Sequence, residues 1–238
     1  MYYTDREVNR GSASYADSFS GYLSRVFLMM FLGLGLTGLI AVFGSYSESV
    51  VETMLRLSSG NGIFVFFLVY IGIVFGFQRS VSHLNTGMAL VLFFAYAAIT
   101  GFMWSILGLV FEVSAIWKAF LAAGIFFGVM ALYGATTKRD LGQFRTILFV
   151  GLISILIVSI LNFFFFRSSG LDMGISILGV LIFAGYTAYD VRMLREAYES
   201  VGDERSLNAV AIYGAFQLYL DFINLFLYLL RLFGRRRD

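Results

Sequence analysis

The sequence contains no cysteine and no proline, and His83 is its single histidine. The missing cysteines exclude disulfides, thiolate metal sites and cysteine nucleophiles, and one histidine cannot form a histidine-based metal cluster. Without proline, any break in a membrane helix must come from glycine or from side-chain hydrogen bonds. These absences argue against an enzyme and against a resident cofactor.

Charge is also scarce, because 13% of the 238 residues are charged and 59% are hydrophobic. The mean hydropathy is +0.83. A soluble domain carries about 25% charged and roughly 45–50% apolar residues, so the excess apolar surface must face lipid. The net charge of +2 is too small to indicate a nucleic-acid partner. Because the apolar stretches are continuous and not alternating, the fold class is all-α integral membrane.

Seven stretches have the length and apolarity of a membrane-spanning helix, which takes about 20 residues. They are residues 24–44, 63–79, 87–110, 116–134, 146–166, 173–190 and 209–231. We expect a polar cytoplasmic tail over residues 1–22, a seven-helix transmembrane domain over 23–234 and a basic C-terminal tail over 235–238.

The basic residues predict the orientation, because Lys and Arg concentrate on the cytoplasmic side. With the N-terminus inside, the cytoplasmic segments hold Arg6, Arg10, Arg25, Arg79, Lys138, Arg139, Arg145, Arg192, Arg195 and Arg205, and the outer loops hold Arg56, Lys118 and Arg167. This distribution, with ten basic residues in the cytoplasmic segments and three in the outer loops, predicts a cytoplasmic N-terminus. Arg231 and the arginines at 235–237 conflict with this, unless earlier segments dominate or the last segment dips in and returns.

Small residues predict where helices pack closely, because helix association in lipid depends on close backbone approach. Gly72 with Gly76 and Gly124 with Gly128 form two GxxxG pairs. A tightly packed monomeric bundle is the main interpretation of these pairs, and a dimer interface is the alternative.

One acidic residue, Asp221, lies in the middle of the last apolar segment, where a charge costs on the order of 2.5–3.5 kcal/mol. Its neighbours at helical spacing form a polar stripe of Tyr213, Gln217, Asp221, Asn224 and Tyr228. The remaining faces of this helix are apolar. A helix with a polar stripe and apolar sides belongs in the middle of a bundle. The alternative is that Asp221 makes a structural hydrogen bond or ion pair.

A second acid, Asp190, ends the sixth segment, with Tyr186 one turn earlier on the same face. It could lie solvated at the interface and pair with Arg192 or Arg195. Because the sixth and seventh segments are consecutive, antiparallel pairing could instead bring Asp190 close to Asp221. Two carboxylates within a few Å cannot both stay ionised cheaply, so the pair would titrate as a unit.

Such a pair suits a proton-sensitive latch, a cation site, or both. A basic partner could hold the deprotonated pair, and Arg79 at the end of the second segment is the candidate. An anchoring role for Arg79 at the cytoplasmic interface is the alternative.

Four stretches make the sequence resemble the Bax inhibitor (transmembrane Bax-inhibitor-motif) family, specifically its bacterial inner-membrane branch. They are FAYAAITG at 94–101, LYGATTKRDL at 132–141, GYTAYDVRML at 185–194 and LYLDFINLFLYLLRLFG at 218–234. The resemblance implies a seven-helix bundle in the bacterial inner membrane, with the last helix at the centre and ringed by the other six.

The resemblance also implies a pH-sensitive two-aspartate latch, which falls on Asp190 and Asp221, and a calcium leak across the membrane. Calcium prefers oxygen ligands, so Asp190 and Asp221 would bind it transiently with Gln217, Asn224 and nearby carbonyls. Family members carry a basic latch partner near the cytoplasmic end of the second helix, where the segment RSVSHLN of this chain matches poorly.

Two classes of function therefore remain open. The first is a proton-regulated calcium leak channel with the lipid bilayer, calcium and protons as its partners. The second is a non-conducting regulator of a membrane protease or of a cell-death partner, which would dock on the N-terminal tail and the loop 191–208. An intramembrane aspartyl protease is a third and weaker hypothesis, because neither YTAYD nor LYLDFIN contains a GxGD-type site.

Overall fold

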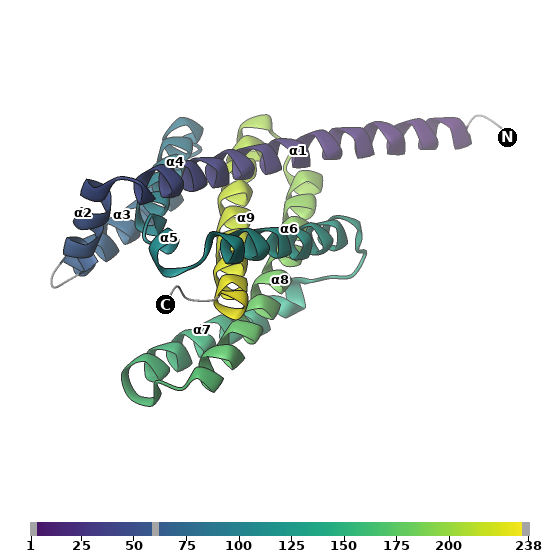
Figure 1. Ribbon diagram of the computed structural model, residues 1–238. Coiled ribbons are helices and arrows are strands. Elements are labelled where there is room, and N and C mark those ends of the chain that lie inside the picture. Colours follow the sequence, from purple (N-terminus) through teal and green to yellow (C-terminus); the bar gives the residue numbers. More distant parts are fainter. Residues whose placement is uncertain (1–3, 59–61, 235–238) are drawn as a thin grey trace.

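The computed structural model describes residues 4–58 and 62–234, and the elements in these ranges are helices. They are α1 (Thr4–Ser45), α2 (Glu48–Ser58), α3 (Gly62–Ser82), α4 (Thr86–Trp104), α5 (Leu107–Val110), α6 (Val113–Thr136), η1 (Gly142–Phe144), α7 (Arg145–Leu161), η2 (Asn162–Phe166), α8 (Ser169–Ser200) and α9 (Glu204–Phe233). The basic tail expected at 235–238 lies outside the described residues. Figure 1 shows the arrangement of these helices.

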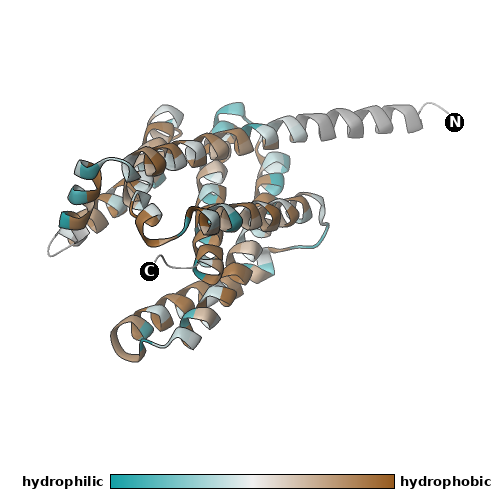
Figure 2. Ribbon diagram, viewed as in Figure 1, coloured by the Kyte–Doolittle hydropathy of each residue, from teal (hydrophilic) through white to brown (hydrophobic). Residues whose placement is uncertain are grey.

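Seven helical stretches are long and apolar enough to cross a membrane, which confirms the predicted fold class. They are Phe19–Ser45, Phe64–Ser82, Thr86–Val110, Val113–Thr136, Gly142–Phe166, Ser169–Ser200 and Glu204–Phe233. Figure 2 shows hydrophobic residues along all of these stretches. The first helix begins at Thr4, so most of the expected polar tail continues α1 instead of standing apart from it.

The last helix, α9, is the most buried of the seven. In its most apolar window 67% of the residues are buried, against at most 44% in any other span. It packs against α1, α3, α4, α6 and α8, whereas the main partner of α7 is α8. Figure 1 shows α9 between α4 and α8, with α7 at the edge of the bundle. Five helices therefore surround α9, and α7 is attached through α8.

Aromatic rings fill the contact between α9 and the helices α3 and α4. The ring centroid of Phe216 on α9 lies 4.3 Å from that of Phe77 on α3 and 5.6 Å from that of Phe93 on α4. Phe93 also meets Tyr219 edge to face. All four side chains are almost fully buried. Large rigid rings bury much apolar area at low entropic cost, so they fix the position of α9.

The close helix contacts use glycines other than the expected GxxxG pairs. A Cβ atom at Gly72, Gly124 or Gly128 would meet nothing within 4 Å, so the expectation of packing within the bundle is wrong for these three. A Cβ atom at Gly101 would instead lie 2.6 Å from the carbonyl oxygen of Thr37, and one at Gly134 would collide with the backbone of α8. Sequence spacing identifies small residues, but it does not say which face meets a neighbour.

The last helix runs without interruption over 30 residues. At 1.5 Å per residue this is about 45 Å, which exceeds the roughly 30 Å hydrocarbon core of a bilayer. A segment that dips in and returns is therefore ruled out for α9. The turn between α8 and α9 and the residue Gly234 lie at opposite ends of the bundle.

Candidate functional site

Helices α8 and α9 form an antiparallel pair joined by a short turn. Asp203 in this turn caps α9, because its carboxylate accepts a hydrogen bond of 2.8 Å from the backbone N–H of Ser206. That hydrogen bond lowers the pKa of Asp203 below its ordinary value. Two small residues let the helices approach, since Gly214 faces Leu194 and Gly179 faces the ring of Tyr228. The turn and these contacts set the register that places Asp190 beside Asp221.

The two aspartates lie in the interior of the protein and contact each other. Asp190 is 4% exposed and Asp221 is 5% exposed. Their carboxyl groups interact directly with each other. An ionised carboxylate can only accept a hydrogen bond, so a hydrogen bond between the two would need a proton on one of them. Two buried acidic side chains therefore lie side by side at a place where a shared proton would be stabilised.

One atom of the pair is left over. The Oδ2 atom of Asp221 is buried and has no hydrogen-bond partner among the residues that the structure describes. A buried polar atom without a partner costs about 1–3 kcal/mol. Such an oxygen marks a place where a further donor or a cation would be stabilised.

The arginines near Asp190 are engaged elsewhere. Arg192 pairs with Glu196 at 2.8 Å and donates to the carbonyl oxygen of Thr137. Arg195 likewise pairs with Glu199 and donates to the carbonyl oxygen of Ala135. These contacts fasten α8 to the end of α6. Asp190 is thus neither solvated at the interface nor, within residues 4–58 and 62–234, paired with either arginine.

The polar stripe of α9 is its least buried face. Tyr213, Gln217, Asn224 and Tyr228 are half-buried, and Asp221 is the one fully buried member. The Tyr213 hydroxyl lies near the side chain of Gln78 on α3. The amide of Asn224 donates to the carbonyl oxygen of Leu220. The stripe therefore follows the seam between α9 and its neighbours, on one side of the helix.

Arg79 does not reach the aspartates in this structure. It is exposed in the last turn of α3, and none of the ion pairs among the described residues includes it. Its neighbour Phe77 packs its ring against Phe216 of α9, and Gln78 lies near Tyr213. The proposed role of Arg79 stays a prediction.

Another arginine, Arg145 at the start of α7, lies exposed on the side of the bundle that holds Tyr186, Tyr189 and Tyr213. These three tyrosines are also the ones whose surroundings include Asp190. The register of α7 on α8 accounts for this, because Leu148 of α7 lies against Gly185 of α8. Its position at the start of an apolar segment made Arg145 look like an interfacial anchor, so sequence reasoning missed it.

A second buried polar cluster lies on the opposite side of α9. The Tyr219 hydroxyl is hydrogen-bonded to Thr37 of α1 at 2.8 Å and lies near the hydroxyl of Thr100 on α4. Thr37 also donates to the carbonyl oxygen of Ala97, and Tyr70 of α3 donates to Thr100. We call these four side chains, Thr37, Tyr70, Thr100 and Tyr219, the hydroxyl chain. In the sequence, Tyr219 is one of several aromatic residues in an apolar helix. Its spacing therefore did not predict this cluster of hydroxyl groups.

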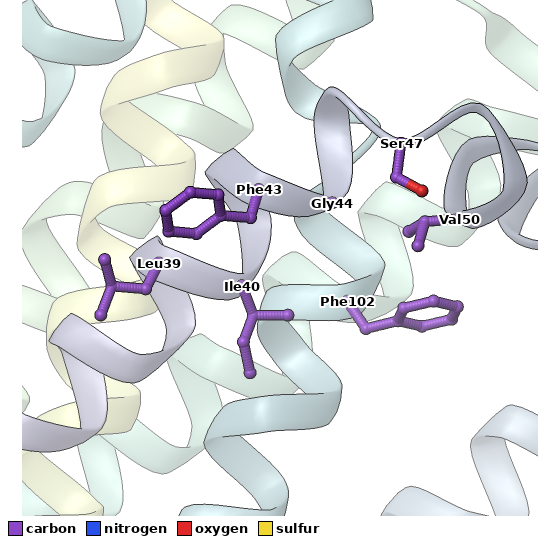
Figure 3. A pocket seen from close by; sticks show the side chains of 7 residues that line it. All are labelled: Leu39, Ile40, Phe43, Gly44, Ser47, Val50 and Phe102. Atoms are coloured by element: carbon purple, nitrogen blue, oxygen red, sulfur yellow. The ribbon is translucent and has the colours of Figure 1, made fainter.

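Two recesses open on the surface of the bundle. One of about 330 Å³ lies between α1, α2 and α4. Figure 3 shows its apolar lining, in which Ser47 supplies the one polar side chain. The other, of about 380 Å³, lies between α3, α4 and α9 and is lined by aromatic residues together with Thr100 and Asn224. We call it the α3–α4–α9 crevice.

The structure limits what metal the site can hold. In the described parts of the chain, no three acidic or histidine side chains come together as a metal cluster. The aspartate pair could offer a cation two carboxylates, with neutral oxygens besides. Calcium takes six to eight oxygen ligands when it is bound firmly. A site with two carboxylates therefore suits brief binding of calcium better than firm binding.

A polytopic helical membrane protein with a carboxyl pair buried between its last two helices is the class that this fold and site define. The family described as "Inhibitor of apoptosis-promoting Bax1" matches residues 20–238, and the chain belongs to this Bax inhibitor family. The chain is 37% identical to the inner membrane protein YbhL of Escherichia coli strain K12 over 220 residues, which cover 91% of the chain and 92% of YbhL.

Two further relatives match over a similar length. An uncharacterized protein of Borreliella burgdorferi is 38% identical over 221 residues, covering 91% of the chain and 93% of that protein. The uncharacterized protein RP147 of Rickettsia prowazekii is 36% identical over 217 residues, covering 91% and 90% respectively. The predicted family is therefore confirmed, and YbhL is by its name an inner membrane protein.

Proposed function

We propose that the protein is a pH-sensitive calcium leak channel of the bacterial inner membrane, with Asp190 and Asp221 as its latch. The observation that carries the proposal is the pair of interacting carboxyl groups, buried between the two helices that a latch would have to separate. A proton bound between the two carboxyls holds α8 against α9. Loss of that proton leaves two negative charges side by side, which repel each other.

Calcium would pass as a transient occupant of the pair. The deprotonated carboxylates attract a divalent cation, and the stripe residues Gln217 and Asn224 supply neutral oxygens on the same side of α9. Conduction requires that binding be favourable enough to enter and weak enough to leave. A pair of carboxylates without a complete ligand cage fits that requirement.

We further propose that the turn between α8 and α9 lies on the cytoplasmic side. The basic residues Arg192, Arg195 and Arg205 flank this turn. Lys138 and Arg139 lie in the loop between α6 and α7, which Arg192 ties to the same end of the bundle. A concentration of basic residues at one end favours the cytoplasm for that end.

Calcium flux into proteoliposomes, measured across a series of pH values, tests the channel. We expect a flux that depends on pH with one midpoint, and we expect Asp190→Asn and Asp221→Asn to remove that dependence. Glu48→Gln is the matched control, because it also removes one acid but lies exposed in the first turn of α2. If the calcium flux of both aspartate variants depends on pH as that of the wild type does, Asp190 and Asp221 do not form a latch.

A wild-type protein that conducts no calcium at any pH would overturn the channel itself. The non-conducting regulator would then be the better description of this chain. Deletion of residues 1–20, followed by analysis of co-purifying proteins and of proteolysis of membrane substrates, would test that alternative. If neither changes, the N-terminal segment is not the docking element.

A further inference from the structure

The α3–α4–α9 crevice has the properties of a ligand site that opens within the membrane. It has a volume of about 380 Å³, and small-molecule sites range over roughly 300–1,000 Å³. Its lining residues belong to three membrane-spanning segments. They are Phe66, Phe67, Tyr70, Tyr96, Thr100, Met103, Trp104, Leu220, Ile223, Asn224 and Leu227. A molecule that enters here must be soluble in lipid.

The lining favours a flat ring over a flexible chain. Five of the lining side chains are aromatic, contributed by α3 and α4. Tyr70 and Tyr96 meet edge to face with their ring centroids 4.9 Å apart, so their relative orientation is set before anything binds. Rigid aromatic walls stack on planar rings, whereas a lipid tail needs apolar surface of any shape.

Three residues that line the crevice, Tyr96, Trp104 and Asn224, carry hydrogen-bond donors that the protein does not use. In the part of the chain that the structure describes, neither the hydroxyl of Tyr96 nor the indole N–H of Trp104 has a hydrogen-bond partner. Asn224 uses one amide hydrogen on the carbonyl oxygen of Leu220 and keeps the other. The indole N–H and the amide N–H can only donate, and the Tyr96 hydroxyl can also donate. Three donors in an apolar recess call for a ligand that carries acceptors.

We propose that the crevice binds a membrane-soluble quinone, a planar ring with carbonyl acceptors and an apolar tail. The ring lies among the aromatic side chains, its carbonyl oxygens accept from Tyr96, Trp104 or Asn224, and its tail leaves toward the lipid. Acyl chains lack acceptors and would leave all three donors unused. The proposal does not depend on calcium conduction.

Tryptophan fluorescence gives a direct test, because the chain has two tryptophans. Trp104 lines the crevice, and Trp117 is 61% exposed on α6. Trp117→Phe leaves Trp104 as the reporter, and Trp104→Phe leaves Trp117. A benzoquinone with one short isoprenoid tail is titrated into liposomes that contain each variant. We expect saturable quenching of Trp104 and a linear, collisional quenching of Trp117.

Substitutions in the crevice then separate a site from simple partition into lipid. In the Trp117→Phe background, Tyr96→Phe or Asn224→Leu should weaken quinone binding about five- to tenfold, the effect of one hydrogen bond. Leu121→Ala, at an exposed position of α6, should leave the affinity unchanged. A thermal unfolding curve for each variant shows whether it folds.

Two results would overturn the proposal. One is linear quenching of both tryptophans, which means that the quinone is merely dissolved in the bilayer. The other is that lipids with brominated tails quench Trp104 and that added quinone does not weaken this quenching. That result means that an acyl chain fills the crevice. Since the assay reads fluorescence and not flux, its outcome is independent of the channel proposal.

Discussion

Helix α9 carries two buried polar side chains two residues apart, Tyr219 and Asp221. They lie on opposite sides of the helix and differ in whether their polar atoms have hydrogen-bond partners. Tyr219 faces α1 and α4, where its hydroxyl is hydrogen-bonded to Thr37. Asp221 faces α8, where its carboxyl group interacts with that of Asp190 and leaves its Oδ2 atom without a partner among the described residues. A satisfied neutral network stabilises a fold, whereas a half-satisfied acidic pair is costly and indicates function. The two faces should therefore respond differently to the same kind of change.

The largest difference is expected from adding one methyl group to a glycine on each face. Gly101→Ala places a carbon 2.6 Å from the backbone oxygen of Thr37, so α1 and α4 must separate. We expect a loss of about 1–3 kcal/mol in the free energy of unfolding. Gly179→Ala places a carbon 2.6 Å from the Cγ, Cδ1 and Cδ2 atoms of Tyr228, so this packed ring must shift, and because a side chain gives way more readily than a backbone its loss should be somewhat smaller.

Urea or thermal unfolding in detergent measures both glycine variants. Gly128→Ala is the control for added helix propensity, because nothing lies within 4 Å of that position. Equal losses for Gly101→Ala and Gly179→Ala would mean that the two contacts are equally rigid.

Removing one hydroxyl tests whether the Tyr219 side is structural. Tyr219→Phe keeps the ring and deletes the hydrogen bond to Thr37, so we expect a loss of about 1 kcal/mol in unfolding free energy. The pH dependence of calcium flux should not change. Tyr46→Phe, at a position that is 84% exposed, serves as the control. A changed pH response in Tyr219→Phe would connect the hydroxyl chain to the latch.

The acidic side should show the reverse pattern. Asp221→Asn keeps the size of the side chain and can donate an amide N–H to Asp190, so unfolding free energy at neutral pH should change by less than about 1 kcal/mol. Its dependence on pH should become weaker than in the wild type, because the pair can no longer share a proton. Melting temperatures across a pH series measure this, and parallel curves for the two proteins would contradict it.

The smallest effect is expected at the turn that joins the two helices. The lowered pKa of Asp203 means that its carboxylate stabilises the fold above the ordinary Asp pKa of about 3.9. This contribution is lost as the pH falls through the lower pKa of the folded state. Asp203→Ala should lower the melting temperature slightly at neutral pH, and the difference should vanish in strong acid. Asp203→Asn keeps a capping side chain without the titration and should lose less.

The sequence by itself determined the class of protein, the seven spans and the polar stripe of α9. Long apolar runs must become helices in lipid, because every backbone N–H and C=O has to be paired there. Helical periodicity then places Tyr213, Gln217, Asp221 and Asn224 on one face, wherever that face points. Both inferences rest on local geometry, so they needed no knowledge of neighbouring helices.

The tertiary structure alone decided which helix each face meets. It placed Asp190 against Asp221, packed Phe77 of α3 on α9 while Arg79 stays exposed, and brought Arg145 toward the tyrosines around the pair. It also built the hydroxyl chain and left Gly124 and Gly128 unpacked. The physical reason is that periodicity assigns residues to a face, whereas contact depends on the axial offset and rotation of two helices. Those are set by the packing of many side chains together.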